Sequence, residues 1–392
     1  MKQKQKIAVY SGDIPSTTFI ERLIRGLSQR DLQIMLFGFL KTSNPSYNNS
    51  VTLVAYKNTR FQKVLHLLKY TMLLVLFRFK DKRKLDSILK TSNQNTLREK
   101  VKYYPVLWHK PDVFHLQWAK GISDWIWVKE FGIKLILSLR GAHINYSPIA
   151  DETLAETYTS LFPHVDGFHA VSKAIAKEAV RYGAPEDRIK VVYSGLDVNP
   201  SEDSNSTSNK IFNIVSIGRS HWVKGYSYAI DMCKILKEAN VNFKYTIIGG
   251  DDSVELSYQI NDLGLEAHVE LLGQMPFKTV KSFIERSDLL LLSSVKEGVA
   301  NVVLEAMALK TLVLATDSGG MAEVITPYEN GYLSTIRDPE SLASKVLEII
   351  DLKQDKRNSI LENAYEYIQD HHRQDTMING MCALYDNTKI VS

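Results

Sequence analysis

Residues 297–305 have the sequence Glu-Gly-Val-Ala-Asn-Val-Val-Leu-Glu, in which two carboxylates bracket an apolar run at the start of a helical pattern. If Gly298 and Asn301 open this helix, Glu305 lies about two turns further on, on the face that carries Asn301 and Val302. One carboxylate then lies at the helix N-terminus and the other lies deeper along the same wall. Two acceptor groups at such a separation suit a ligand with several hydroxyls, such as a nucleotide sugar.

A second motif lies upstream, where Gly218, Arg219 and Lys224 follow the β-branched run 211–217. This run is typical of a buried parallel strand, and the residues after Lys224 predict a helix that ends near Ala239. A glycine between strand and helix lets backbone N–H groups approach an anion, and the helix N-terminus favours negative charge. Arg219 offers a planar fork for phosphate oxygens, and Lys224 offers a point charge. The alternative, that both cations only decorate a solvated loop, is weakened by the two carboxylates downstream.

These residues resemble those of a known family. In order and spacing, residues 211–350 are similar to the donor-binding domain of the family 4 retaining glycosyltransferases, which have the GT-B architecture of two facing Rossmann-like domains. The matching pieces are Gly218-Arg219, Lys224-Gly225, 247–250, Leu272-Gly273, Ser287-Asp288, 297–308, Gly319-Gly320, Glu323 and Asn330-Gly331. Looser matches to the acceptor-side domain are found at 16–20, 111–115, 170–172, 183–185 and 195–197.

The resemblance implies an α/β fold of two facing Rossmann-like domains, with parallel sheets flanked by helices and a cleft between the domains. An acceptor-side domain is expected at 1–197 and a nucleotide-sugar donor domain at 211–374. The polar, aperiodic residues at 198–210 are the best linker candidate in the chain. The helix at about 375–392 is expected to pack back on the first domain.

The order of strand-like and helical patterns supports this fold class independently. Strands that alternate with helices favour a parallel sheet wrapped on both faces. In the first half, the strand-like runs are 7–10, 33–38, 51–55, 113–116, 135–139, 167–171 and 190–192.

The resemblance also implies an activity, that of a retaining, metal-independent hexosyltransferase. It would move a sugar from a nucleotide-sugar donor, with UDP favoured and GDP-mannose as the alternative, to a glycan or lipid-linked acceptor in cell-surface polysaccharide biosynthesis. Charge develops on the departing diphosphate, and Arg219, Lys224 and the helix N-terminus near Asn301 are suited to stabilise it. By resemblance, Glu297 contacts hydroxyls of the transferred sugar and Glu305 binds the ribose. The favoured front-face path needs no protein nucleophile, so none is assigned.

Further site residues are expected in both halves. The donor-binding candidates are Gly12, Gly218, Gly273, Val299, Ala300, Asn301 and Glu305. Arg140 stands where many relatives carry a histidine, and His143 stands where relatives often carry an aspartate. Arg140 could bind phosphate or an acidic acceptor group, and His143 could serve the sugar, but each could also be an ordinary loop residue.

The first half departs from the family pattern near its N-terminus too. The expected glycine-rich loop after the first strand is reduced to residues 11–13, although Gly12 and residues 16–18 are still expected to line the cleft. His115 ends a strand. It either faces the cleft or is a satisfied core histidine, and the sequence leaves both interpretations open.

Composition excludes several other classes of function. The formal charge of +4 is too small to indicate nucleic-acid binding, and no aromatic-basic interleaving is present. Cys233 and Cys382 lack metal spacing and predict neither a disulfide framework nor a thiolate zinc site. Asp251-Asp252 lacks the Asp-X-Asp pattern of metal-dependent transferases and is expected to form a turn and a helix cap, so no metal or cofactor is expected.

Localisation is predicted from the absence of membrane and export signals. No secretory signal is evident, and the longest aliphatic cluster, 72–77, is too short to span a bilayer. We therefore expect the protein in the cytoplasm, with peripheral contact at the inner face of the membrane as an open question.

That question rests on residues 57–84, which hold nine basic side chains and one acidic side chain. Apolar residues recur among them at nearly helical spacing. One interpretation is an interfacial helix that touches anionic lipid. The other is an amphipathic core helix whose basic face is solvated.

Two alternatives to a transferase remain open. One is a catalytically silent relative that serves as a binding subunit, which is favoured by Arg140 in the place of histidine. The other is a different enzyme on the same scaffold, such as an epimerase. Detectable hydrolysis of a sugar donor would separate the transferase from the silent subunit.

Overall fold

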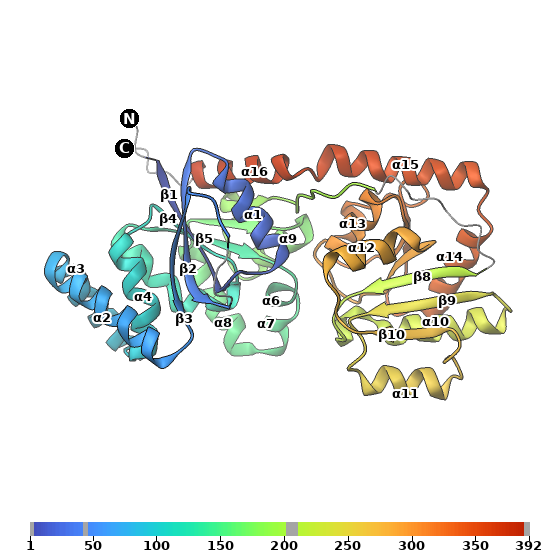
Figure 1. Cartoon of the computed structure of the whole chain (residues 1–392), viewed down its shortest axis with the longest axis horizontal. Helices are drawn as coiled ribbons and strands as arrows, with labels where there is room; N and C mark the ends of the chain where they lie inside the picture. Colours follow the sequence, from blue (N-terminus) through green and yellow to red (C-terminus); the bar gives the residue numbers. More distant parts are fainter. Residues whose placement is uncertain (1–3, 42–45, 201–210, 388–392) are drawn as a thin grey trace. The chain divides into compact units, whose positions relative to one another are not determined.

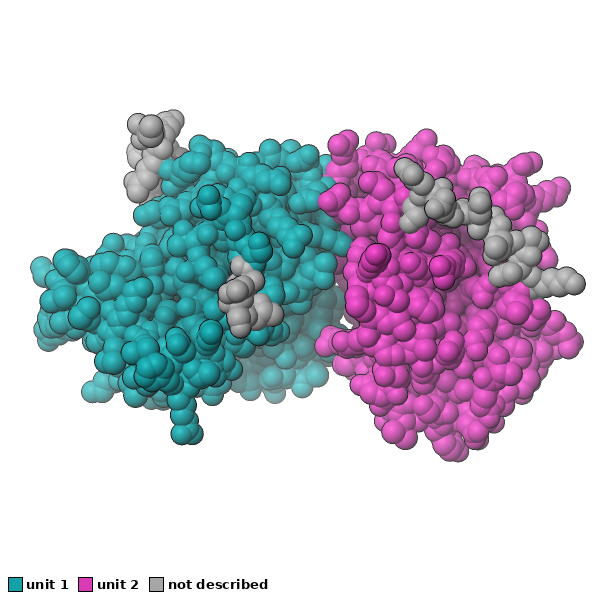
Figure 2. Space-filling view, viewed as in Figure 1, with its two compact units in different colours: residues 1–171, 175–195, 374–392 teal, residues 172–174, 196–373 magenta. Residues whose placement is uncertain are grey.

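The computed structural model describes residues 4–41, 46–200 and 211–387. The chain divides into two compact units, coloured separately in Figure 2. Unit 1 comprises Met1–Val171, Ile175–Gly195 and Gln374–Ser392, and unit 2 comprises Ser172–Ala174 and Leu196–Arg373. Most of the predicted linker 198–210, and the end of the predicted C-terminal helix, lie outside the described residues.

Unit 1 is built on a seven-stranded parallel sheet in the order β3-β2-β1-β4-β5-β6-β7 (Figure 1). Its strands are β1 (Gln5–Ile14), β2 (Leu32–Leu40), β3 (Val51–Lys57), β4 (Val113–Leu116), β5 (Lys134–Leu139), β6 (Gly167–Ala170) and β7 (Ile189–Val191). Each of the seven predicted strand-like runs overlaps one of these strands. Its helices are α1 (Thr18–Ser28), α2 (Arg60–Phe77), α3 (Phe79–Thr91), α4 (Leu97–His109), α5 (Ile122–Trp125), α6 (Ala142–Asn145), α7 (Ser147–Ala150), α8 (Glu152–Leu161), α9 (Lys173–Arg181) and α16 (Gln374–Asn387).

Helices cover both faces of this sheet, because successive strand residues point to opposite sides. On β1, Ile7 and Val9 join a core with α1 and α16, whereas Ala8 joins the core under α2 to α5. Figure 1 shows α16 running beside α1 on the first of these faces. Coverage on both sides explains why β4 is buried at all four of its positions rather than alternating between buried and exposed residues.

The structure corrects the predicted glycine loop after the first strand. Residues 11–13 do not form a loop, since β1 continues to Ile14 through a bulge between Tyr10 and Gly12. Gly12 has φ +91°, and a Cβ on its partner Gly38 would lie 2.4 Å from the Gly12 carbonyl oxygen. Two glycines therefore allow the two strands to pair beyond the bulge, where larger residues would force them apart.

Unit 2 is built on a six-stranded parallel sheet in the order β10-β9-β8-β11-β12-β13. Its strands are β8 (Phe212–Ile217), β9 (Phe243–Ile248), β10 (Val269–Leu272), β11 (Leu289–Leu292), β12 (Leu312–Thr316) and β13 (Tyr332–Ser334). Its helices are α10 (Tyr226–Glu238), α11 (Val254–Asp262), α12 (Phe277–Arg286), α13 (Asn301–Ala308), α14 (Pro339–Ile350) and α15 (Gln354–His371). One core packs α10, α11 and α14 on the sheet, and another packs α12, α13 and α15 on the opposite face. Two parallel sheets flanked by helices confirm the predicted fold class.

The strand order of unit 2 marks one place for a ligand. Strands β8, β9 and β10 follow one another toward one edge, whereas β11, β12 and β13 run toward the other. The direction in which successive strands are added across the sheet therefore reverses between β8 and β11. In open parallel sheets, ligands bind outside the carboxyl ends of the strands at such a switch point.

Candidate functional site

Gly218 follows β8 at this switch point, and its neighbours explain why it is glycine. Its N–H donates to the Ile248 carbonyl (3.0 Å), and its carbonyl accepts from the Tyr226 hydroxyl (3.1 Å). A Cβ at this position would lie 2.9 Å from the Tyr226 hydroxyl and 3.1 Å from Cε of Lys224. Both side chains therefore fold over the glycine, which brings Lys224 to the end of the strand.

The loop after β8 is clamped to the loop after β11. The Ser293 hydroxyl donates to the Lys224 carbonyl (2.9 Å), and the Val295 N–H donates to the Val223 carbonyl (2.8 Å). Gly225 has φ +63°, and a Cβ on it would lie 2.1 Å from the Ser293 carbonyl oxygen. The strand-to-helix glycine is thus required for close approach of the two loops.

Lys224 and Glu297 form an ion pair at the centre of this arrangement. Lys224 Nζ lies 2.7 Å from Glu297 Oε1, and the two side chains are only 23% and 14% exposed. The Ser294 hydroxyl donates to the same carboxylate oxygen (2.8 Å). Burial and the Glu297 charge raise the pKa of Tyr226, so its hydroxyl stays a neutral donor. An ammonium carries three N–H donors and the pair uses one, which leaves Lys224 able to bind an anion.

A glycine turn after β12 packs against the backbone of Glu297 and Gly298. The Gly320 N–H donates to the Gly298 carbonyl (2.7 Å). Gly319 has φ +64°, and a Cβ on it would lie 1.8 Å from the Glu297 carbonyl oxygen. The ends of β8, β11 and β12 therefore meet around one carboxylate and one ammonium.

The structure corrects the predicted start of the next helix. α13 begins at Asn301, with Ala300 as an extended N-cap, so Gly298 and Val299 precede it. The reason is tertiary, because the Gly298 carbonyl is engaged by the glycine turn. Glu305 therefore lies one turn into the helix rather than two.

The first residue of α13 presents an unsatisfied acceptor. Asn301 Oδ1 is buried and has no hydrogen-bond partner among the described residues. A buried polar atom without a partner costs free energy, so a donor from a ligand would stabilise the site. The first N–H groups of a helix also lack intrahelical acceptors and favour negative charge.

Arg219 and Gly273 lie at other positions along the same edge. Arg219 is exposed directly after Gly218, while Gly273 follows β10, which β9 separates from β8. A Cβ on Gly273 would lie 2.9 Å from a carboxylate oxygen of Asp251. The predicted Asp251-Asp252 turn is present, but the α11 cap is Ser253, whose hydroxyl accepts from the Leu256 N–H (3.3 Å).

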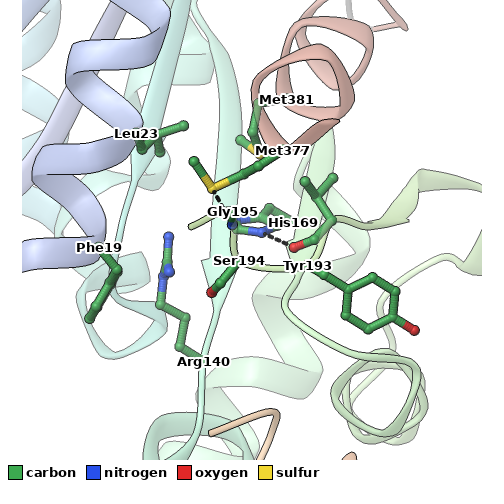
Figure 3. Close-up of a pocket in the computed structure, with 10 residues that line it drawn as sticks. Phe19, Leu23, Arg140, His169, Tyr193, Ser194, Gly195, Met377 and Met381 are labelled. Atoms are coloured by element: carbon green, nitrogen blue, oxygen red, sulfur yellow. Dashed lines mark hydrogen bonds between the residues drawn. The ribbon is translucent and has the colours of Figure 1, made fainter. Parts of the chain in front are cut away.

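In unit 1, Arg140 is held by neighbouring side chains. Its Nη2 donates to Gln117 Oε1 (3.0 Å), and its guanidinium lies 4.5 Å from the centre of the Phe19 ring. Burial lowers the pKa of Arg140 to about 10, so it remains a cation at neutral pH. Figure 3 shows it beside a cavity of about 10 Å³ that Leu23 and Met377 also line. That volume admits at most about one water molecule, so this cavity does not fit a phosphate.

His143 lies in α6, where its ring centre is 5.4 Å from that of Trp118 and its carbonyl accepts from the Tyr158 hydroxyl (2.9 Å). Gly12 lies in the β1 bulge. Arg140, His143 and Gly12 belong to unit 1, whereas Lys224 and the residues around it belong to unit 2. The two groups are therefore described separately.

His115 proves to be a satisfied core histidine in a chain of buried hydrogen bonds. The His169 Nε2–H must donate to the Val192 carbonyl (3.0 Å), so His169 Nδ1 accepts from the Ser138 hydroxyl (2.9 Å). Ser138 in turn accepts from His115 Nε2–H (2.8 Å), and His115 Nδ1 accepts from the Tyr385 hydroxyl (2.9 Å). Both histidines are neutral because burial lowers the pKa of each ring, and the neutral rings set these directions. The chain connects α16 to β4, β5 and β6.

Buried histidines make the stability of unit 1 dependent on pH. Burial lowers the pKa of His66 and His109 to about 4 and that of His169 to about 3, and it holds the pKa of His115 well below 6.5. Below pH 6.5 the unfolded chain therefore binds protons that the folded unit excludes. We expect the free energy of unfolding to be highest above this pH and to fall, as pH decreases, by about 1.4 kcal/mol per pH unit for each histidine.

Urea denaturation at neutral pH and at about pH 5 measures this slope. His66→Phe provides the comparison, because His66 Nε2 is buried without a hydrogen-bond partner among the described residues. This variant should fold and reduce the slope by one histidine. Equal unfolding free energies at both pH values would contradict the expectation.

Comparison with known proteins agrees with the geometry. The model of the family described as "Glycosyl transferases group 1" matches residues 199–367, and that described as "Glycosyltransferase Family 4" matches residues 16–200. An amylovoran biosynthesis glycosyltransferase, AmsK of Erwinia amylovora, is 29% identical over 224 residues, 55% of each chain. A putative colanic acid biosynthesis glycosyltransferase, WcaL of Escherichia coli K12, is 27% identical over 268 residues, 66% of each chain. The aligned part of the chain thus spans between 55% and 66% of the length of these curated relatives.

Solved structures share the fold over nearly the whole chain. Anabaena Alr3699/HepE in complex with UDP superposes with a TM-score of 0.71 at 19% identity, covering 97% of this chain and 99% of that one. Sucrose-phosphate synthase of Thermosynechococcus elongatus gives a TM-score of 0.76 at 15% identity and covers 98% of both chains. At such low identity, the likeness shows the fold alone.

Proposed function

The chain belongs to the group 1, family 4 glycosyltransferases, and we propose that it transfers a sugar from a nucleotide-sugar donor to a glycan or lipid-linked acceptor. We further propose that the transfer retains anomeric configuration and needs no metal. In this proposal, the acceptor is an intermediate in the biosynthesis of a cell-surface polysaccharide. This context is supported by the amylovoran and colanic acid relatives.

The observation that carries the proposal is the Lys224–Glu297 ion pair at the β8–β11 switch point. During transfer, negative charge develops on the departing diphosphate. The Lys224 ammonium is fixed in direction by Glu297 before the donor arrives, so little reorganisation is needed when this charge appears. The N-terminus of α13 adds positive potential at the same strand end.

Other residues take roles consistent with their positions. Arg219, exposed after Gly218, closes on the diphosphate as a bidentate donor. Glu297 accepts from hydroxyls of the transferred sugar, and Glu305 accepts from those of the ribose. Asn301 Oδ1, buried without a protein donor, accepts a further ligand hydroxyl. The base is held near Gly273.

We propose UDP as the nucleotide of the donor, with GDP-mannose as the alternative. The HepE structures contain UDP and UDP-glucose, which supports a uridine donor on this fold. Positive groups already converge on the diphosphate position, so a metal ion is not required to neutralise it. In the proposed mechanism, the leaving phosphate accepts the proton of the acceptor hydroxyl on the same face of the sugar.

Thermal denaturation with nucleotides tests donor binding. A ligand that binds only the folded state raises its stability, by about 2.7 kcal/mol at a concentration 100 times its dissociation constant. We expect UDP to raise the melting temperature more than GDP or ADP. Arg219→Ala should weaken this binding about tenfold to a hundredfold, since a hydrogen bond to a charged group contributes about 1.5–3 kcal/mol.

Arg286→Ala is the matched control, because Arg286 is an exposed arginine at the end of α12 in the same unit. It should leave the shift unchanged. A folded protein whose melting temperature responds to none of the nucleotides would favour the silent binding subunit instead.

Arg140, in place of the family's histidine, is the observation that keeps the silent subunit as a second candidate. Incubation with the donor that binds separates the candidates. Release of the nucleoside diphosphate supports a transferase, whereas an unchanged donor supports the silent subunit. A donor whose sugar is converted to its epimer, with the diphosphate still attached, would indicate an epimerase.

A further inference from the structure

The helices α2 and α3 expose an unusual number of large apolar side chains. Among the described residues, nineteen such side chains are exposed, and nine of them lie between residues 61 and 79. These are Phe61, Val64, Leu65, Leu68, Met72, Val75, Leu76, Phe77 and Phe79. We call this set, together with the basic residues of 57–84, the α2–α3 face. Apolar patches of this kind on a folded protein mark interaction sites.

The spacing along α2 places these side chains on one stripe. Phe61, Leu65, Leu68, Met72 and Val75 are separated by steps of four and three residues, the repeat of a single helix face. The stripe does not face the core of unit 1, since Phe61, Leu68 and Met72 are 68%, 60% and 58% exposed.

The opposite side of α2 is the side that packs. Tyr70 and Leu74 are its buried residues, and they belong to the core that α4 also joins. The helix is therefore apolar on both sides. α2 packs on the core, as one of the two interpretations expected, but its outer face carries exposed apolar side chains as well as basic ones.

Positive charge accompanies the stripe. Residues 57–84 hold nine basic residues and one acidic residue, while the whole chain has a formal charge of only +4, so the rest of the chain is net acidic. Arg60, Lys69, Lys80 and Arg83 are exposed and form no ion pair among the described residues. In Figure 1, α2 and α3 project from the body of unit 1, where such charges meet solvent.

The charge decides which partner the α2–α3 face fits. A second copy of the chain would cover the apolar stripe, but it would also bring two strongly basic segments together without counter-charges. A bilayer surface with anionic lipid offers acyl chains to the stripe and phosphate groups to the cations. In the described part of the chain no helix has both the length and the apolar character to cross a bilayer, so such contact would be peripheral.

We propose that the α2–α3 face docks unit 1 on the surface of a membrane that contains anionic lipid. The apolar stripe enters the boundary between headgroups and acyl chains, and the basic residues bind lipid phosphates around it. This surface is separate from the residues around Lys224. It therefore adds a membrane partner to the proposed transferase rather than restating it.

Co-sedimentation of the full chain with lipid vesicles tests the proposal. We expect binding to vesicles of equal parts phosphatidylcholine and phosphatidylglycerol, weak binding to phosphatidylcholine alone, and loss of binding at high salt. A variant with Phe61→Ser, Leu68→Ser and Met72→Ser should bind at least about tenfold more weakly. A variant with Lys69→Glu, Lys80→Glu and Arg83→Glu should also weaken binding at least about tenfold. All six side chains are exposed, so both variants should fold.

Matched controls change exposed side chains of the same kind on other helices. Val254→Ser with Tyr258→Ser on α11, and Lys177→Glu with Lys356→Glu on α9 and α15, should leave vesicle binding unchanged. The proposal would be overturned if the native chain fails to bind the anionic vesicles, or if both α2–α3 variants bind like the native chain.

Light scattering on the same samples identifies the other possible occupant. A native chain that is dimeric and does not bind vesicles, together with a monomeric apolar variant, would assign the stripe to a second copy and overturn the proposal. No sugar donor is used, so these outcomes are distinct from those that test the transferase.

Discussion

Replacing Lys224 with methionine is expected to slow the release of the nucleoside diphosphate from the nucleotide-sugar donor by about a hundredfold to a thousandfold. This is the usual cost of removing one preorganised group that stabilises charge in the transition state. Methionine preserves the bulk of the side chain that packs over Gly218. The loss should therefore appear mainly in kcat, measured as release of the nucleoside diphosphate at a saturating concentration of donor. A melting temperature close to that of the native chain would show that the fold persists.

Glu297→Gln tests the other half of the ion pair. The glutamine can still accept from the Ser294 hydroxyl, but it no longer neutralises or directs the Lys224 ammonium. We expect a loss of at least about tenfold in kcat/KM. Because the two residues act as one unit, the double variant should lose much less than the product of the two single losses.

Lys234→Met is the matched control for this pair of variants. Lys234 and Glu238 form an ion pair on α10 of the same unit, but their side chains are 39% and 63% exposed. Exposed pairs contribute little, so this variant should keep native kcat. If Lys224→Met also keeps native kcat, the assignment of Lys224 to the diphosphate is wrong.

Strand positions were predictable because both sheets are covered on both faces. Strands buried on two sides tend to be uninterrupted apolar runs, as at Leu289–Leu292, and the polar segments between them stand out in the sequence. The sequence did not predict that a strand can continue beyond the end of its apolar run. β1 continues through the bulge at Gly12 because of its pairing with Gly38, and no local pattern specifies that partner.

The site residues were predictable as types but not as partners. Spacing selected Lys224 and Glu297 separately, yet their direct contact joins positions 73 residues apart in the chain. Ser294, which shares the carboxylate oxygen with Lys224, carried no signal as a side-chain ligand. The predicted start of α13 was wrong for a related reason. The Gly320 N–H donates to the Gly298 carbonyl, which lies before the first residue of the helix.

Contacts of long sequence separation account for the remaining differences. The choice between a cleft role and a core role for His115 was settled by Tyr385, 270 residues away. The apolar period of α2 was visible in the sequence, but which of its two sides is covered depends on α4. Periodicity predicts that a face is apolar, and only packing shows whether anything covers it.

Gly319→Ala is expected to destabilise unit 2 by about 3 kcal/mol or more and to abolish nucleotide binding. The residue has φ +64°, and its new Cβ would lie 1.8 Å from the Glu297 carbonyl oxygen. That contact is impossible without moving the backbone of Glu297, which would separate the carboxylate from Lys224. Urea denaturation measures the stability, and the UDP-dependent shift in melting temperature measures the site.

Gly264→Ala separates the clash from the cost of the backbone angle itself. Gly264 has nearly the same angle, φ +62°, in the same unit, but its Cβ would meet only the end of the Lys237 side chain, at 3.3 Å. It should cost about 1–2 kcal/mol and leave nucleotide binding intact. The difference between the two variants therefore isolates the contact with Glu297. If both lose the same stability and both still bind nucleotide, the glycine turn after β12 does not position the carboxylate.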